Sequence, residues 1–309
     1  MRRAGAAAGV ALLLLPFCAG AERKSAPLAE IPIRIDRHKV IVPATVGKSG
    51  PLGLILDTGM PDDGILVFHA DKVDREALDG LTEVRIAGAG RGGAARALRD
   101  EDAAFSVGSK TFEGERVTIL ESNLYKGFPT DGVIGHSLLG RFAVEVDPDA
   151  RRMLLYEPTE FSPEAGWESI DIYFKDNRIP WTNVRMSTAG EEPVEVAAYI
   201  DSASGEALEL LARETNAYRM PATSTRRLAG RGLSGDVYGR AGRVSALGIG
   251  PFVLENVGVL VVPAEVRSRQ EGADVVIGGD VLRRFRVIYD YAHGKIHLRP
   301  GGSFTERFP

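Results

Sequence analysis

The chain has 309 residues, 44% of them hydrophobic, which is enough to bury a sizeable core. Its formal net charge of −4 and the even spread of its arginines leave no basic stripe and so argue against a nucleic-acid partner. The only cysteine is Cys18, so the rest of the chain must be stabilised by core burial rather than by disulfide bonds.

The first residues have the three parts of a secretory signal peptide. Arginines near the N-terminus precede an apolar run from Val10 to Phe17, and Ala19-Gly20-Ala21 forms a small-residue cleavage site. The run is too short to cross a membrane. The residue before Cys18 is not small, which argues against a lipid anchor. We therefore expect cleavage after Ala21 and a periplasmic or secreted mature protein without a transmembrane segment.

Short β-rich runs separated by Gly, Asp and Pro dominate the remaining sequence. The predicted strands include residues 31–35, 40–46, 52–56, 84–86, 103–107, 117–120 and 144–146. Helix signals are few, and they predict short helices over 137–141, 207–215 and 280–284. Because strands do not alternate with long helices, we predict an all-β fold of two β-barrel-like lobes.

Two of the apolar runs end in the same kind of segment. The first leads into Asp57-Thr58-Gly59 and the second, 144 residues later, into Asp201-Ser202-Ala203. Each is followed by a further apolar run that ends in glycine, Val133-Ile134-Gly135 and Val276-Ile277-Gly278. The hairpins beyond these glycines, 144–156 and 287–298, keep the same offset. A pattern that stays in step over most of the chain indicates an internal duplication.

The duplication predicts how the chain is divided. After a signal peptide at residues 1–21 we expect an N-terminal lobe at 28–157 and a Pro- and Gly-containing linker at 158–166. A C-terminal lobe at 167–300 and a short tail at 301–309 complete the chain. Each lobe contributes one aspartate, so a pseudo-twofold axis would bring the two carboxylates together.

Two adjacent carboxylates are a means of activating water. They cannot both stay charged at close range, so one acts as a base toward water and the other as an acid toward a carbonyl group. The small residues Gly59 and Ala203 allow the sharp turns that such an approach requires. The hydroxyls of Thr58 and Ser202 can satisfy buried backbone groups in those turns.

These motifs resemble those of the retropepsin-like and pepsin-like aspartic proteases, in which Asp-Thr/Ser-Gly/Ala and a later pair of apolar residues plus Gly occur once per lobe. The resemblance covers roughly residues 31–298 and is to a bacterial two-lobed form with fused retropepsin-type lobes. It implies an interlobe cleft and hydrolysis of peptide or protein substrates by activated water, without a metal or other cofactor. Asp57 and Asp201 would be the catalytic pair, and the chain would be a monomer that forms an internal pseudo-dimer.

The resemblance also implies glycine-rich hairpins that close over the substrate. One such segment lies between the two motifs of each half. The first half has Ala87–Gly93, with Gly88, Gly90 and Gly92, and the second has Ala229–Gly235, with Gly230 and Gly232. The residues after each motif depart from the family pattern, since Met60-Pro61 follows the first and Ser204-Gly205 the second. The shape of the cleft and the size of the substrate stay open.

Two alternatives remain at this point. A two-lobed periplasmic module could keep both aspartates and bind peptides without cutting them. The segment Gly135-His136-Ser137-Leu138-Leu139 partly matches a nucleophile elbow, which would make Ser137 the nucleophile of a serine hydrolase with His293 or His297. The histidines have no spacing that indicates a metal site.

Overall fold

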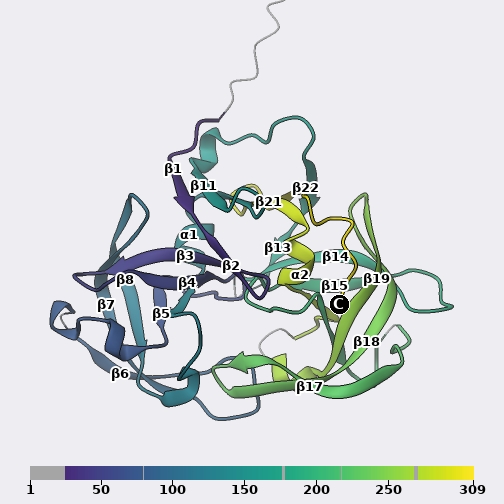
Figure 1. The fold of residues 1–309 in the computed structure, drawn as a ribbon, viewed down its shortest axis with the longest axis horizontal. Coiled ribbons are helices and arrows are strands. Elements are labelled where there is room, and N and C mark those ends of the chain that lie inside the picture. Colours follow the sequence, from purple (N-terminus) through teal and green to yellow (C-terminus); the bar gives the residue numbers. More distant parts are fainter. Residues whose placement is uncertain (1–24, 79, 176–177, 217, 268–270) are drawn as a thin grey trace, which may run out of the picture.

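The computed structural model describes residues 25–309 apart from 79, 176–177, 217 and 268–270. The expected signal peptide at 1–21, including Cys18, lies outside the described residues. The regular elements of the described chain are mostly strands, which form two eight-stranded sheets and one six-stranded sheet (Figure 1).

The N-terminal lobe contains the first eight-stranded sheet. Its strands are β2 (Arg34–Asp36), β3 (Lys39–Val46), β4 (Leu52–Leu56), β5 (Ile65–Val67), β6 (Thr82–Ile86), β7 (Ala95–Val107), β8 (Lys110–Leu120) and β9 (Gly132–Ile134). They lie in the order β2-β3-β4-β9-β5-β8-β7-β6. Three 3₁₀ turns connect them: η1 (Ala70–Lys72), η2 (Arg75–Ala77) and η3 (Asn123–Tyr125).

The C-terminal lobe repeats this topology. Its strands are β13 (Tyr173–Phe174), β14 (Pro180–Ser187), β15 (Val194–Ile200), β16 (Leu208–Ala212), β17 (Thr223–Gly232), β18 (Gly235–Ile249), β19 (Phe252–Pro263) and β20 (Val275–Ile277). Their order, β13-β14-β15-β20-β16-β19-β18-β17, matches that of the first sheet strand for strand. In each lobe the strand before the aspartate motif pairs in parallel with the strand of the later apolar motif, β4 with β9 and β15 with β20.

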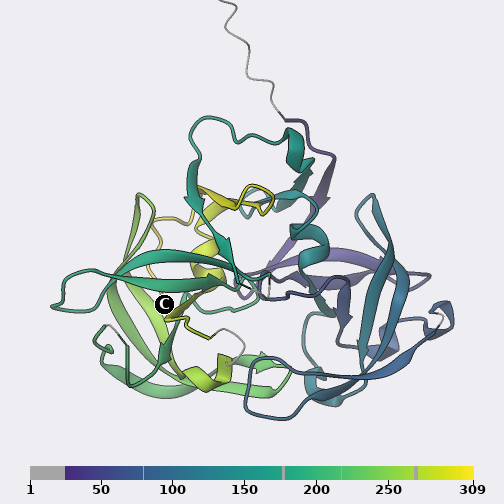
Figure 2. The same ribbon diagram turned by 180° about the vertical axis from the view of Figure 1, so that it is seen from behind.

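A third sheet joins the two lobes. It consists of β1 (Ala29–Pro32), β11 (Arg152–Tyr156), β10 (Ala143–Asp147), β21 (Phe285–Asp290), β22 (Lys295–Pro300) and β12 (Glu168–Asp171), in that order. The two views of the ribbon show this sheet bridging the lobes at one end of the molecule (Figures 1 and 2). From the sequence, each hairpin ends its own lobe; in the structure the two hairpins share one sheet.

The central pairing of this sheet reveals the internal symmetry. β10 and β21 run antiparallel with Glu145 opposite Ile288, Val144 opposite Tyr289 and Val146 opposite Val287. Exchanging each residue for its counterpart 143 positions along the chain reproduces the same set of pairs. A pseudo-twofold axis therefore passes between Glu145 and Ile288, as the constant sequence offset predicts.

Short helices follow the apolar motifs, and one predicted helix is wrong. α1 (His136–Leu139) and α2 (Gly279–Leu282) confirm the expected helices at 137–141 and 280–284 to within two residues. Residues 208–212, expected to be helical, form β16, which lies between β19 and β20. Its leucines are buried, so pairing on both edges and burial override the helix propensity of Leu, Glu and Ala. The remaining 3₁₀ turns are η4 (Pro158–Glu160) and η5 (Ala264–Arg267).

One hydrophobic core runs through all three sheets. It contains Leu54 from the N-terminal lobe, Leu208 from the C-terminal lobe, and Val144 and Val287 from the shared sheet. Because these side chains belong to one connected cluster, the lobes are held in a fixed relation to each other. The aspartate motifs lie where the lobes meet.

Candidate active site

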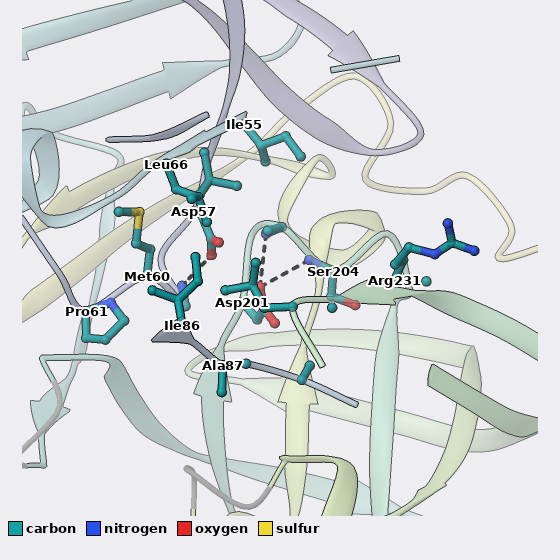
Figure 3. A pocket seen from close by; sticks show the side chains of 18 of the residues that line it. Ile55, Asp57, Met60, Pro61, Leu66, Ile86, Ala87, Asp201, Ser204 and Arg231 are labelled. Atoms are coloured by element: carbon teal, nitrogen blue, oxygen red, sulfur yellow. Dashed lines mark hydrogen bonds between the residues drawn. The ribbon is translucent and has the colours of Figure 1, made fainter. Parts of the chain in front are cut away.

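Strand pairing brings both predicted catalytic aspartates to the interface between the lobes. Asp57 follows β4 and its backbone N–H donates to the Ile134 carbonyl of β9 at 2.8 Å. Asp201 follows β15 and donates in the same way to the Ile277 carbonyl of β20 at 2.9 Å. Figure 3 shows the two side chains in one pocket. Each apolar motif ending in glycine therefore fixes the position of the aspartate in its own lobe.

The hydroxyl residues after the aspartates cross-link the two lobes. The backbone N–H of Thr58 donates to Ser202 Oγ at 3.0 Å, and that of Ser202 donates to Thr58 Oγ1 at 3.0 Å. Thr58 Oγ1 donates in turn to the Ile200 carbonyl at 2.7 Å, and Ser202 Oγ to the Leu56 carbonyl at 2.6 Å. Both side chains are buried. The four reciprocal bonds hold the turns that carry the aspartates in a fixed relation to each other.

The small residues after the hydroxyls hold the carboxylates. Gly59 N–H donates to Asp57 Oδ1 at 2.8 Å, while the N–H groups of Ala203 and Ser204 donate to Asp201 Oδ1 at 3.1 and 3.2 Å. A Cβ at position 59 would lie 3.1 Å from Asp57 Oδ1 and 3.2 Å from Asp201 Oδ1. Both carboxylates thus flank one glycine, which is why a side chain there would crowd the pair.

The surroundings of the two carboxylates differ. Arg267 of η5 donates from Nη1 to Asp201 Oδ2 at 3.1 Å. The same guanidinium donates to both oxygens of Glu209, from Nη2 to Oε1 at 2.6 Å and from Nε to Oε2 at 3.0 Å. Ser204 Oγ also donates to Glu209 Oε1, at 2.8 Å. A buried arginine therefore bridges Asp201 and Glu209.

Asp57 has no such partner among the described residues, and its protonated form is favoured. Burial, and next the charge of Asp201, raise the pKa of Asp57 to about 7, against the opposing effects of the Gly59 hydrogen bond and of Arg267 and Lys39. Below neutral pH Asp57 therefore holds a proton, while Arg267 hydrogen-bonds the neighbouring Asp201. A protonated carboxyl beside a second carboxyl group is the arrangement that combined acid and base catalysis needs.

The two glycine-rich segments predicted as flaps meet above the aspartates. The backbone N–H of Ser234 donates to the Ala89 carbonyl at 3.0 Å, and that of Gly92 donates to the Ser234 carbonyl at 2.6 Å. The N–H of Gly88 donates to Ser234 Oγ at 3.3 Å. The tip of β6–β7 thereby pairs with the tip of β17–β18, and each lobe supplies one flap.

The flaps cover a cavity of about 480 Å³. Gly88, Gly230 and Gly232 line it, whereas Gly90 contacts the Val266 carbonyl and Gly92 contacts the opposite flap. The cavity walls combine apolar and charged side chains. Ile55, Leu66 and Ile86 are among the apolar ones (Figure 3), and Lys39, Glu209 and Arg267 are among the charged ones. A hollow that combines apolar walls with convergent polar groups is typical of a substrate site.

The structure argues against the serine-hydrolase alternative. The Ser137 side chain is fully buried, and its hydroxyl donates to Glu115 Oε2 at 2.8 Å rather than facing the cavity. His293 and His297 both contact Asp290, at 2.8 and 3.5 Å, far along the chain from this serine. With no histidine bonded to it and no solvent access, Ser137 lacks the activation that a nucleophile requires.

The sequence did not reveal Arg267 or Glu209. Glu209 lies opposite Val276 in the pairing of β16 with β20, and Leu66 lies opposite Val133 in the equivalent pairing of β5 with β9. The charged pair therefore occurs where the two halves differ. Comparing the halves position by position would have identified Glu209, because a charged residue there replaces an apolar one.

The described residues contain neither a metal-binding cluster nor a membrane-spanning helix. In that part of the chain no three His, Cys, Asp or Glu side chains are grouped so that they could hold a metal ion. Within the same residues, no helix combines the length and the apolar character that crossing a membrane requires.

No protein-family model and no curated protein sequence matches the chain. Among solved structures, the chain is similar to the aspartic proteinase from Irpex lacteus, with a TM-score of 0.55 and 12% sequence identity over 90% of this chain and 98% of that one. Similarity at this identity shows the fold alone. It confirms the all-β, two-lobed fold expected from the sequence.

Proposed function

We propose that the protein is an aspartic endopeptidase in which Asp57 and Asp201 activate one water molecule for peptide hydrolysis. The observation that carries this proposal is the pair of aspartates held by reciprocal hydroxyl bonds between the lobes, under two flaps. The similarity to an aspartic proteinase supports the fold in which this chemistry would occur.

The protonation state of the pair defines the order of proton transfers. Asp201 takes a proton from water as the oxygen attacks the scissile carbonyl carbon, and Asp57 gives its proton to the carbonyl oxygen. The resulting diol collapses when Asp201 passes its proton to the amide nitrogen and Asp57 recovers one from a hydroxyl. The C–N bond breaks, an acid and an amine leave, and both aspartates return to their starting states.

The cavity defines the substrate class. The apolar side chains among its walls, such as Leu66 and Phe68, suit a peptide segment with hydrophobic side chains beside the cleaved bond. The flaps must separate to admit a chain, because their tips are hydrogen-bonded across the entrance. We therefore expect extended or unfolded peptides to be cut faster than folded proteins.

The test is cleavage by the purified mature protein. Casein or a mixed peptide library, incubated from acidic to neutral pH, should be cut at internal bonds, and a statine-type transition-state analogue should block the reaction. Tight binding of the analogue and of peptides without any cleavage would contradict the proposal and support the second candidate.

That second candidate is a non-catalytic peptide-binding module, and one observation favours it. Arg267 donates a hydrogen bond to Asp201 Oδ2 at 3.1 Å, so a cation already occupies part of the acceptor that water would need. A module that only binds peptides would tolerate such an ion pair. Cleavage of peptides decides between the two.

We also propose that the mature protein begins near Glu22 and is exported to a periplasm or beyond. The leader with its small-residue site before Glu22 supports this. N-terminal sequencing of the exported form checks it. Retention of residues 1–21, or a lipid on Cys18, would contradict export as a free mature chain.

A further inference from the structure

Arg267, Glu209 and Asp201 form a closed network at one side of the cavity. The Arg267 side chain is 14% exposed, while those of Asp201 and Glu209 are 8% and 2% exposed. Glu209 engages two nitrogens of the guanidinium, which leaves Nη1 directed at Asp201 Oδ2. The planar fork of arginine makes such an arrangement rigid.

Among its described residues, the N-terminal lobe has no counterpart to this network. Leu66 occupies the position of Glu209, and Met60 follows the first motif where Ser204 follows the second. The turn equivalent to η5 is η3, where Tyr125 donates its hydroxyl to the Arg231 carbonyl of the opposite flap at 3.1 Å. The two halves share one topology, but in the part of the chain that the structure describes only the C-terminal half has an arginine that contacts the aspartate of the motif.

We propose that Arg267 is a positioning residue that keeps Asp201 the charged member of the pair and so assigns the base role to Asp201 and the acid role to Asp57. This inference rests on the proposed peptidase function. A symmetrical pair of carboxylates offers a proton two equivalent positions, whereas a guanidinium on one side favours the proton on the other. Asp201 Oδ2 keeps a free lone pair for water, because it accepts one N–H from Arg267.

Other titratable groups also face the pair, and Arg267 interacts with two of them, Glu209 and Tyr199. Burial lowers the pKa of Lys39, which lies on β3 and is attracted to both aspartates. Burial raises the pKa of the tyrosines near the pair, so they stay neutral in the working range. The titratable and charged groups around the pair are Lys39, Tyr125, Tyr199, Glu209, Arg267 and Tyr291.

The test is the pH profile of kcat/KM for Arg267→Met. Removal of a cation beside two coupled carboxylates makes both protons harder to lose. The acidic and the basic limb of the kcat/KM profile should therefore both move to higher pH by about one to three units. Arg267→Lys should bring the limbs back toward their original positions, because it keeps the charge. Arg227→Met removes a different arginine, paired with Glu206 outside the cavity, and should leave both limbs in place.

A second variant moves the profile the other way and keeps the arginine. Glu209→Gln removes the negative charge that offsets Arg267, so both limbs should shift to lower pH. Opposite shifts for the two variants support the inference. If both limbs of the pH profile stay fixed while kcat falls, Arg267 has a purely structural role. If Arg267→Met has a higher kcat/KM at every pH, Arg267 inhibits the enzyme. Either result overturns the inference.

A readout without turnover separates this inference from the proposed function. Carbon-13 carboxyl resonances of labelled protein, assigned with Asp57→Asn and Asp201→Asn, should show the same upward displacement of the pair's titration in Arg267→Met. If the unaltered protein cuts no peptide, the peptidase proposal fails while this titration still tests the arginine. A titration identical to that of the unaltered protein would refute the role of Arg267.

Discussion

Replacing Thr58 by valine tests whether the crossed hydroxyls hold the lobes together. Valine keeps the shape of threonine but removes Oγ1, which accepts the Ser202 N–H at 3.0 Å and donates to the Ile200 carbonyl at 2.7 Å. The Thr58 side chain is only 2% exposed, so water cannot take the place of the hydroxyl. Both backbone groups would then be buried without a partner.

The cost follows from the number of groups left unpaired. Each buried polar group without a partner costs about 1–3 kcal/mol, so two of them should destabilise the protein by about 2–6 kcal/mol. For a protein of this size, each kcal/mol shifts the unfolding midpoint by about 2–4 °C, and a loss of about 3 kcal/mol should lower Tm by about 6–12 °C. Ser202→Ala should cost a similar amount, because it strands Thr58 N–H and the Leu56 carbonyl.

The assay is thermal unfolding followed by circular dichroism, with Thr82→Val as the matched control. The Thr82 hydroxyl also donates to a backbone carbonyl, that of Arg99 at 3.2 Å, but Thr82 is exposed. Loss of the Thr82 hydroxyl should lower the free energy of unfolding by less than about 0.5 kcal/mol. Equal and small changes in Tm for Thr58→Val and Thr82→Val would refute the idea that the hydroxyl pair stabilises the interface.

Three further predictions address the pair, the flaps and Ser137. Because the folded-state pKa of Asp57 is about 7 and its ordinary value is 3.8, the contribution of Asp57 to stability falls as pH rises from about 4 to about 7. The kcat/KM should fall over the upper part of this range. The Tm of Asp57→Asn should exceed that of the unaltered protein at about pH 8 but not at about pH 4. Gly232→Ala places a Cβ 2.2 Å from the Ala89 carbonyl oxygen of the other flap. It should raise KM about tenfold, which corresponds to the loss of one flap hydrogen bond. The Cβ of Gly93→Ala meets nothing within 4 Å, so this control should leave KM unchanged. Ser137→Ala should leave kcat/KM nearly unchanged and reduce the free energy of unfolding by about 1–3 kcal/mol, as measured by urea titration.

The local features of the site could be predicted because short-range sequence patterns determine them. An apolar run ending in Asp-Thr-Gly or Asp-Ser-Ala favours an aspartate at the end of a strand, and the constant offset predicts that the two ends meet. The glycines at 88–92 and 230–232 indicate turns that approach other backbone closely, and the two tips do contact each other.

Long-range features could not be predicted in the same way. The pairing of β10 with β21 joins segments more than 130 residues apart, and it depends on the relation between the lobes rather than on either hairpin. The strand β16 has a helix-like composition, and only its position between two neighbouring strands makes it extended. Arg267 and Glu209 break the repeat, so a search for what the halves share passes over them.

The most direct test of the account is peptide cleavage by Asp57→Asn, Asp201→Asn and the double variant. Each single change should abolish nearly all turnover while the fold is retained, because asparagine keeps the shape of aspartate and the crossed hydroxyls of Thr58 and Ser202 still hold the two turns. The double variant should be little worse than either single one, since the pair acts as a unit. Undiminished cleavage by Asp201→Asn, or loss of cleavage in a folded Ser137→Ala, would contradict the assignment of the aspartate pair.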